Sequence, residues 1–140
     1  MANNKNKVLI VEDEAIVNIL RLKFEQSDFI VAIARDGIEA LKTLEKFTPD
    51  IILLDILMPV MNGFEFMDKL KEDNRFKNIP IIIFSNFDRG VDIQKAREAG
   101  ALDYIIKVDT TIERLVARVK EYLDNKNNDN LPDRNTISAF

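Results

Sequence analysis

Several polar side chains follow apolar runs of the sequence, at points where strands are predicted to end. They are Glu12 and Asp13 after residues 7–11, Asp55 after 51–54, Ser85 after 80–84 and Lys107 after 102–106. Short apolar runs bounded by turn signals are typical of strands covered on both faces, as in a parallel sheet. The carboxyl ends of parallel strands share one edge of the sheet, where open α/β sheets bind their ligands. We therefore expect these side chains to share one site.

The charges of this set do not balance. Three carboxylates a few ångströms apart repel one another, which raises their proton affinity unless a cation intervenes. Lys107 supplies one positive charge, so the remaining negative charge suits Mg²⁺, which binds a few carboxylates together with water and phosphate oxygens. One carboxylate could then act as a nucleophile toward a phosphoryl group, while the metal and the lysine stabilise the transferring oxygens.

Each of these residues also has a purely structural explanation. Asp55 could cap a turn, Glu12 and Asp13 could complement a helix dipole, Ser85 could cap a helix, and Lys107 could be a solvated strand-end lysine. Taken singly, these explanations are the better ones. The occurrence of all five residues at the same end of different strands favours a functional site.

Composition excludes several classes of chemistry. The chain has 140 residues, which is the length of one domain with a sizeable core. It has no cysteine and no histidine, which excludes disulfides, thiolate metal sites and the commonest general base. A metal ion would therefore have to be a hard cation bound by oxygens. The net charge of -4 and the pI of about 4.9 argue against direct binding of nucleic acid.

The amino terminus lacks the apolar core of a signal peptide, and no apolar run approaches the length needed to span a membrane. We therefore expect a cytoplasmic protein that does not bind membranes.

A fifth predicted strand covers residues 29–34, and helical periodicity separates the predicted strands. The spacing of apolar residues predicts helices over 15–26, 37–47, 63–72, 88–99 and from 112 to 123. Their expected buried faces include Ile16, Ile19, Leu20 and Phe24 in the first, and Ile112, Leu115, Val116, Val119, Tyr122 and Leu123 in the last. Five strands alternating with five helices indicate an α/β fold, namely a doubly wound, flavodoxin-like parallel sheet of order 2-1-3-4-5 with helices on both faces.

Local signals mark the helix ends. Asp36 and Thr110 each precede a glutamate by three residues, which is the pattern of a capping box. Asn62-Gly63 begins the third helix, and Gly100 suits the position just after the fourth. Residues 125–140 are rich in Asn and Asp, so we expect a disordered polar tail, with a partner-binding segment as the alternative.

Over residues 6–124 the chain resembles the receiver (CheY-like) domains of two-component response regulators. The residues that carry the resemblance are Glu12-Asp13, Asp55 within Asp-Ile-Leu-Met-Pro, Asn62-Gly63, Ser85, Tyr104 and Lys107. It implies that Asp55 accepts a phosphoryl group from the phosphohistidine of a sensor histidine kinase or His phosphotransfer protein. It also implies that the protein is a signalling phosphoacceptor, and that it catalyses only its own phosphotransfer and dephosphorylation.

The resemblance also implies roles for the other residues. Asp13, Asp55 and the backbone carbonyl of Leu57 would bind Mg²⁺ directly, and Glu12 would act through water. Ser85 and Lys107 would hold the phosphoryl oxygens.

Tyr104 would be the switch aromatic, turning inward as Ser85 moves toward the phosphate. The fourth helix, fifth strand and fifth helix would then signal to a downstream protein, with a phosphorylation-dependent homodimer as a further mode. Because no effector domain follows residue 124, we expect either a stand-alone receiver or a fragment of a longer protein.

Three positions near the site depart from the family pattern or vary within it. Val108 stands where the family usually has a cis proline, so we expect either a trans peptide with a shifted loop or a strained cis one. Leu57 and Phe87 occupy positions that tune phosphate lifetime in the family. Two apolar side chains beside the site would restrict attacking water, which predicts slow self-dephosphorylation.

Two other functions compete with a phosphorylated receiver. A pseudo-receiver would keep the fold as a phosphorylation-independent interaction module, and only Val108 favours it. A phosphatase or a nucleotide- or flavin-binding protein of similar topology is disfavoured, because no glycine-rich phosphate-binding motif occurs. A haloacid-dehalogenase-type phosphatase would also be expected to have an acid at position 57.

Overall fold

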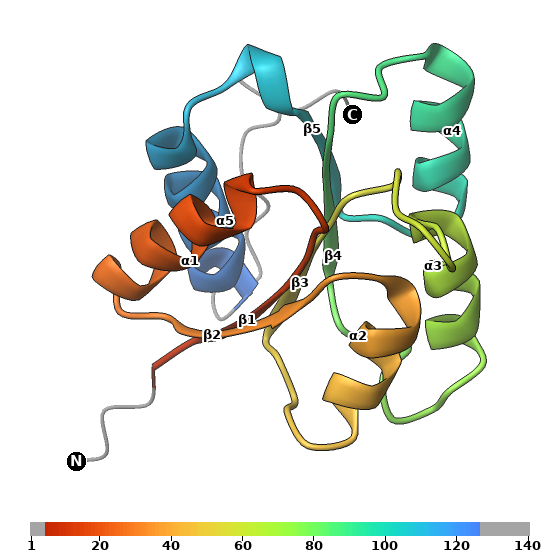
Figure 1. The fold of residues 1–140 in the computed structure, drawn as a ribbon, viewed down its shortest axis with the longest axis horizontal. Coiled ribbons are helices and arrows are strands. Elements are labelled where there is room, and N and C mark those ends of the chain that lie inside the picture. The colour runs from red at the N-terminus through yellow and green to blue at the C-terminus, as the bar shows by residue number, and fades with distance from the viewer. Residues whose placement is uncertain (1–4, 127–140) are drawn as a thin grey trace.

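The structure, a computed structural model, describes residues 5–126 apart from the side chain of Lys126. Its strands are β1 (Lys7–Val11), β2 (Ile30–Ala34), β3 (Ile51–Leu54), β4 (Ile81–Ser85) and β5 (Asp103–Ile106). They form one parallel sheet in the order β2-β1-β3-β4-β5, which confirms the predicted topology (Figure 1). Each predicted strand is present, with its ends displaced by at most one residue.

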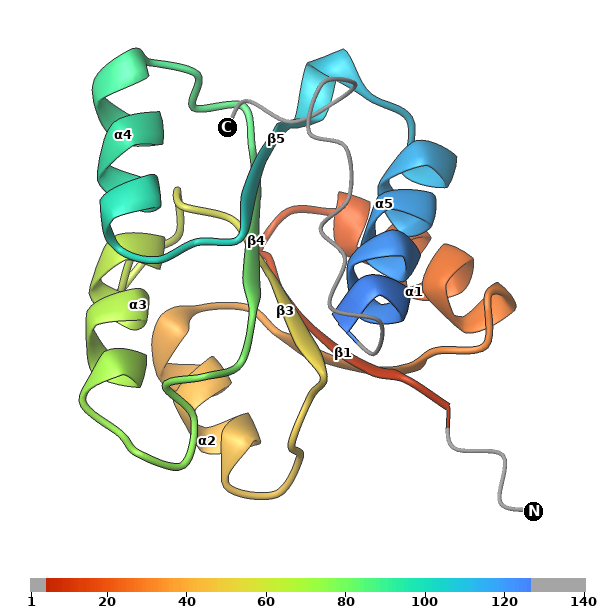
Figure 2. The ribbon, with the colours of Figure 1, turned by 180° about the vertical axis from the view of Figure 1, so that it is seen from behind.

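Helices cover both faces of the sheet. They are α1 (Ile16–Gln26), α2 (Gly37–Leu44), α3 (Gly63–Lys71), α4 (Gly90–Glu98) and α5 (Ile112–Lys126). One layer contains α1 and α5, and the other contains α2, α3 and α4 (Figures 1 and 2). Because both faces are covered, β3 and β4 are buried at every position, as their uninterrupted apolar sequences predict.

Strand residues alternate between two apolar cores. In β1, Leu9 and Val11 belong to the core beneath α2, α3 and α4, whereas Val8 and Ile10 belong to the core beneath α1 and α5. This alternation follows from the period of two residues along a strand. The sheet is thereby held from both sides, which fixes the positions of its strand ends.

The buried face of α1 differs from the predicted one. Val17, Leu20 and Phe24 are fully buried, whereas Ile19 is half exposed. The i, i+3, i+7 spacing of the buried residues defines the stripe that faces the sheet, and Ile19 is rotated about 100° away from Leu20 on the helix. The prediction that Ile19 packs in the core is therefore wrong.

Side chains cap the starts of α2 and α3, the first of them at Asp36, where a cap was predicted. At α2 the carboxylate of Asp36 accepts a hydrogen bond from the backbone N–H of Glu39 at 2.8 Å. At α3 the side chain of Asn62 accepts from the backbone of Glu65 at 2.9 Å, and the Glu65 carboxylate accepts from the backbone of Asn62 at 3.0 Å. The second pair completes a reciprocal capping box.

The capping box predicted at Thr110 is wrong. A 3₁₀ turn over Lys107–Asp109 precedes α5, and the helix begins one residue later than that box would require. The cap is Thr111, whose hydroxyl accepts from the backbone N–H of Arg114 at 3.1 Å. The carboxylate of Glu113 instead forms an ion pair with Lys23 on α1, at 3.3 Å.

The last helix is longer than predicted. It continues through Lys126, so residues 125 and 126, which were assigned to the polar tail, are helical. The remainder of the predicted tail lies outside the described residues. Gly100 has a φ of +92° after α4, as expected of a glycine that ends a helix. Within residues 5–126, none of the helices combines the length and apolar character needed to cross a bilayer.

Candidate phosphoacceptor site

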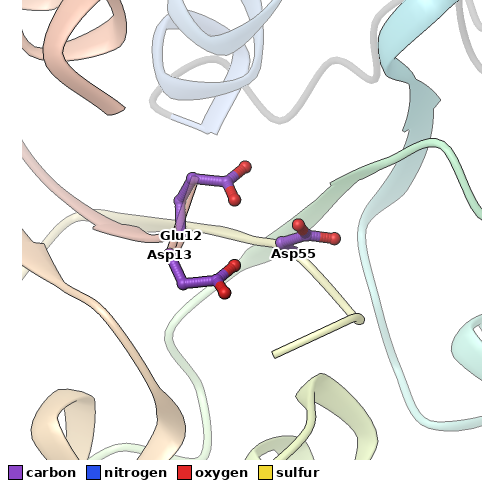
Figure 3. Close-up of side chains that lie close together, drawn as sticks. All are labelled: Glu12, Asp13 and Asp55. Atoms are coloured by element: carbon purple, nitrogen blue, oxygen red, sulfur yellow. The ribbon is translucent and has the colours of Figure 1, made fainter. Parts of the chain in front are cut away.

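Three carboxylates from two strand ends meet at the carboxyl edge of the sheet. Glu12, Asp13 and Asp55 each offer an oxygen, and these oxygens lie within 4.8 Å of one another. Figure 3 shows Glu12 and Asp13 at the end of one strand, with the Asp55 carboxylate beside them. Glu12 and Asp55 are only 2% and 3% exposed, whereas Asp13 is exposed. The structure therefore brings the predicted acidic residues together.

Backbone pairing places the two buried acids. The N–H of Glu12 donates to the carbonyl of Ala34 at 2.9 Å, and the N–H of Asp55 donates to the carbonyl of Val11 at 3.0 Å. Parallel pairing thus continues up to the acidic residues. Each carboxylate also accepts from a backbone N–H two residues ahead, at 3.2 Å for Glu12 and at 3.3 Å for Asp55, where the donor is Leu57.

Gly63 lets α3 approach the loop that follows Asp55. A Cβ atom at this glycine would lie 2.8 Å from the carbonyl oxygen of Asp55 and 2.8 Å from the Cα of Ile56. The N–H of Gly63 donates to the carbonyl of Ile56 at 2.9 Å. The Asn62-Gly63 pair is thus explained locally, since asparagine caps the helix and glycine allows the close approach.

Lys107 enters the acidic cluster from the end of β5. Its Nζ lies 2.7 Å from Oε1 of Glu12, 2.8 Å from Oε1 of Glu14 and 3.0 Å from Oδ2 of Asp55. Burial lowers the pKa of Lys107, but the close contacts with Glu12 and Glu14 and the charges of Asp55 and Glu12 outweigh this effect, so the pKa of Lys107 is raised above its ordinary value. The lysine is therefore a permanent cation in this pocket.

The contact between Glu14 and Lys107 was not predicted. The sequence shows Glu14 as the third member of an acidic run, but the run by itself does not indicate which acid reaches the lysine. The two residues are 93 positions apart in the chain.

Glu12 is the acid most strongly perturbed by its surroundings. Burial and, to a smaller extent, the charge of Asp55 outweigh the opposing effect of Lys107 and together raise its pKa to about 7. Its Oε1 is buried and lies near Lys107, yet it accepts no hydrogen bond of good geometry from the described residues. A buried carboxylate oxygen without a hydrogen bond, beside two further carboxylates, suits an additional cation or its bound water. The residues present therefore fit Mg²⁺.

Ser85 and Tyr104 are connected through one backbone segment. The hydroxyl of Ser85, at the end of β4, accepts from the N–H of Phe87 at 3.2 Å. The hydroxyl of Tyr104 donates to the carbonyl of Phe87. Tyr104 is fully buried, and burial followed by the charges of Asp92 and Asp55 raises its pKa to about 12. Its side chain is thus already turned inward in this structure.

The cluster opens into a pocket of about 350 Å³. Its lining residues are Asp13, Glu14, Asp55, Leu57, Ser85, Asn86 and Lys107. Leu57 lines this pocket, as expected, although its side chain is largely exposed. Phe87 does not belong to the lining. Its ring instead packs against the core and lies 4.5 Å from the guanidinium of Arg89, so only one of the two expected apolar side chains borders the site.

The rim of the pocket departs from the pattern of a proline-containing loop. The described chain contains no cis peptide bond, so the trans alternative at Val108 is the one observed. Lys107 and Val108 begin the 3₁₀ turn, and the N–H of Val108 donates to the side-chain oxygen of Asn86 at 3.0 Å. Proline could not make this bond, because it has no N–H. Asn86 therefore joins the two loops that follow β4 and β5.

Comparison with known proteins agrees with this site. The family model described as "Response regulator receiver domain" matches residues 8–120. The response regulator PleD of Caulobacter vibrioides is 38% identical over 116 residues, covering 81% of this chain and 25% of PleD. The polar-differentiation response regulator DivK of Brucella anthropi is 33% identical over 117 residues, covering 83% of this chain and 94% of DivK.

The solved structure of a receiver domain is also similar to this chain. The BeF3-activated N-terminal receiver domain of Klebsiella pneumoniae RstA superposes with a TM-score of 0.76 at 28% identity, covering 84% of this chain and 98% of that one. This chain thus spans a quarter of PleD and nearly all of DivK and of the RstA domain. The chain belongs to the family of response regulator receiver domains of two-component systems, whose members are signalling phosphoacceptors rather than metabolic enzymes.

Proposed function

We propose that this receiver domain accepts a phosphoryl group on Asp55 from the phosphohistidine of a sensor histidine kinase or phosphotransfer protein. The observation that carries the proposal is the position of the Asp55 carboxylate. It lines an open pocket and lies 3.0 Å from the Lys107 ammonium. The carboxylates of Glu12 and Asp13 lie beside it, and within the described residues no second lysine compensates their negative charge. A reactive carboxylate, a cation and metal-binding oxygens are the parts that phosphoryl transfer requires.

The metal in this proposal is Mg²⁺. Asp13, Asp55 and the backbone carbonyl of Leu57 would hold it directly, and Glu12 would hold it through water, in agreement with the close approach of the three carboxylates. When bound, the ion would supply positive charge to the oxygens of the transferring group.

In the transfer step, an Asp55 carboxylate oxygen attacks phosphorus and forms the new P–O bond. The P–N bond of the donor breaks, and its electron pair remains on the imidazole nitrogen. Lys107 and the Ser85 hydroxyl, which both line the pocket, would donate hydrogen bonds to the phosphoryl oxygens. Ser85 accepts from the backbone of Phe87, and its hydroxyl could donate its own proton to a phosphoryl oxygen.

The response would pass from Ser85 to the side of the domain formed by α4, β5 and α5. β5 is an edge strand, with α4 on one face of the sheet and α5 on the other (Figures 1 and 2). Movement of Ser85 toward the phosphate would pull on Phe87, whose backbone also holds the hydroxyl of Tyr104 on β5. A partner that reads this side, either a downstream protein or a second copy of the chain, would then detect phosphorylation.

The test is intact-mass spectrometry after incubation with acetyl phosphate and Mg²⁺. We expect a gain of one phosphoryl group, about 80 Da, that needs Mg²⁺ and is absent in Asp55→Asn. Beryllofluoride provides a second probe, because the RstA receiver domain is described in its BeF3-activated form. A folded protein with no mass gain and no response to beryllofluoride would instead favour a phosphorylation-independent interaction module.

A further inference from the structure

The ammonium of Lys107 is surrounded by carboxylate oxygens, two of which, on Glu14 and Asp55, accept its hydrogen bonds. It carries three N–H groups, and three carboxylate oxygens lie within 3.0 Å of its nitrogen. Its side chain is only 7% exposed, which leaves little space for a fourth partner. If Lys107 is to bind an incoming phosphoryl group, one of the three carboxylates must therefore move away.

Exposure decides which carboxylate can leave most easily. Glu12 and Asp55 are almost completely buried and are held by backbone N–H groups, so neither can turn toward water. The side chain of Glu14 is 63% exposed, and its only described contact with a cation is the one to Lys107. Its carboxylate can rotate into solvent without being removed from water, so the movement costs little free energy.

The backbone of Glu14 is fixed while its side chain is exposed. Its N–H donates to Oε2 of Glu12 at 3.2 Å, and its carbonyl accepts from the N–H of Val17 at 3.1 Å. The first bond connects Glu14 to the acidic cluster, and the second connects it to the start of α1. The fixed backbone thus keeps the Glu14 side chain at the mouth of the pocket, where it forms part of the lining.

We propose that Glu14 is a positioning residue that holds Lys107 in the resting pocket and is displaced when a phosphoryl group enters. This inference rests on the proposed function of Asp55 as phosphoacceptor. Glu14 competes with the incoming oxygens for one N–H of the ammonium. It therefore weakens the binding of small anionic phosphodonors while leaving the bond-forming step itself unchanged.

Two variants distinguish the effect of the contact between Glu14 and Lys107 from the effect of the negative charge of Glu14. Glu14→Gln removes the negative charge, and Glu14→Asp keeps the charge on a side chain too short by one methylene to maintain the contact with Lys107. Glu25→Gln, which removes an exposed charge near the far end of α1, is the matched control. The assay is the rate of phosphorylation by acetyl phosphate with saturating Mg²⁺, over a range of donor concentrations.

We expect both Glu14 variants to lower the apparent KM for acetyl phosphate about two- to fivefold, the range typical of an exposed ion pair. The maximum rate should stay the same, because an interaction lost before the transition state changes KM alone. The melting temperature should fall by only about 1–3 °C, as expected for one ion pair in a chain of 140 residues. A merely structural role for Glu14 would instead lower the maximum rate and leave KM unchanged or raised.

The other outcomes are equally informative. If Glu14→Asp behaves like the wild type while Glu14→Gln does not, bulk charge explains the effect and the inference is wrong. A raised KM in either variant would also overturn it, because Glu14 would then help Lys107 to bind the donor. If the wild type itself is not phosphorylated, the proposed function fails, and this inference fails with it.

Discussion

Removal of the Lys107 charge should destabilise the fold, because this lysine is the cation that contacts two buried carboxylates. Lys107→Met keeps most of the aliphatic stem but leaves Glu12 and Asp55, both almost fully buried, beside each other without a cation. Breaking a buried ion pair by removing one partner costs about 3–5 kcal/mol. The pocket is open to water, so we expect the lower end of this range, about 3 kcal/mol.

The expected change in melting temperature follows from chain length. An entropy of unfolding of about 2.1 cal/mol/K per residue gives about 0.3 kcal/mol/K for 140 residues, so the shift should be about 10 °C downward. Differential scanning calorimetry in metal-free buffer measures it, and Lys46→Met, at an exposed position, is the control. Added Mg²⁺ should raise the melting temperature of Lys107→Met more than that of the wild type, because the ion then replaces the missing cation.

The double variant Glu12→Gln/Lys107→Met tests the explanation directly. Removing a carboxylate that has lost its cation should recover a large part of the lost stability, which would appear as a favourable coupling free energy in the double-mutant cycle. If Lys107→Met is as stable as the wild type, or if the second substitution recovers nothing, the charges of this cluster do not determine its stability and the reasoning is refuted.

Three further predictions concern the surroundings of the site. Val60 has a φ of +69° in a three-residue turn, which is closed by a hydrogen bond from the N–H of Met61 to the carbonyl of Pro59. Because this conformation is unfavourable for a β-branched residue, Val60→Gly should raise the free energy of unfolding, measured by urea denaturation, by about 1 kcal/mol. A less stable variant would contradict this. Leu57 lines the pocket, so Leu57→Asn should admit water and shorten the half-life of the phosphorylated protein severalfold, and an unchanged half-life would exclude a shielding role. Because the pKa of Tyr104 is raised from 10.0 to about 12, the neutral phenol stabilises the folded state below pH 10, and this contribution is lost as the pH rises toward 12. The free energy of unfolding should therefore fall by up to about 2–3 kcal/mol over that interval in the wild type and by less in Tyr104→Phe. An equal dependence of this free energy on pH in the two proteins would show that the phenol does not titrate as inferred.

Much of the fold could be predicted from short-range patterns. An apolar run such as Ile51–Leu54 can be buried on both faces only in a covered parallel strand, so its pattern indicates the sheet as well as the strand. Asn62 and Gly63 act through neighbouring backbone atoms, and their roles at the start of α3 were therefore predictable. Parallel strands align their carboxyl ends, which explains why Asp55 and Glu12 were expected at one edge.

Predictions failed where the structure depends on how segments pack. The exposure of Ile19 depends on the rotation of α1 against the sheet, and the apolar spacing of that helix suited more than one rotation. The cap of α5 moved to Thr111 because the chain after Lys107 makes a 3₁₀ turn, which no local pattern indicated.

The sequence by itself therefore determined the sheet, the order in which its elements occur and the acids at its edge, since these follow from burial and from residue spacing. Only the tertiary structure decided which side chains touch. Glu14 reaches Lys107 across 93 positions, and Tyr104 reaches the backbone of Phe87 across 17. Such contacts depend on side-chain conformations and loop paths that are set after the strands have assembled. The physical reason is that periodicity specifies which face of an element is buried. Which side chain of another element it contacts across a pocket is specified only by packing.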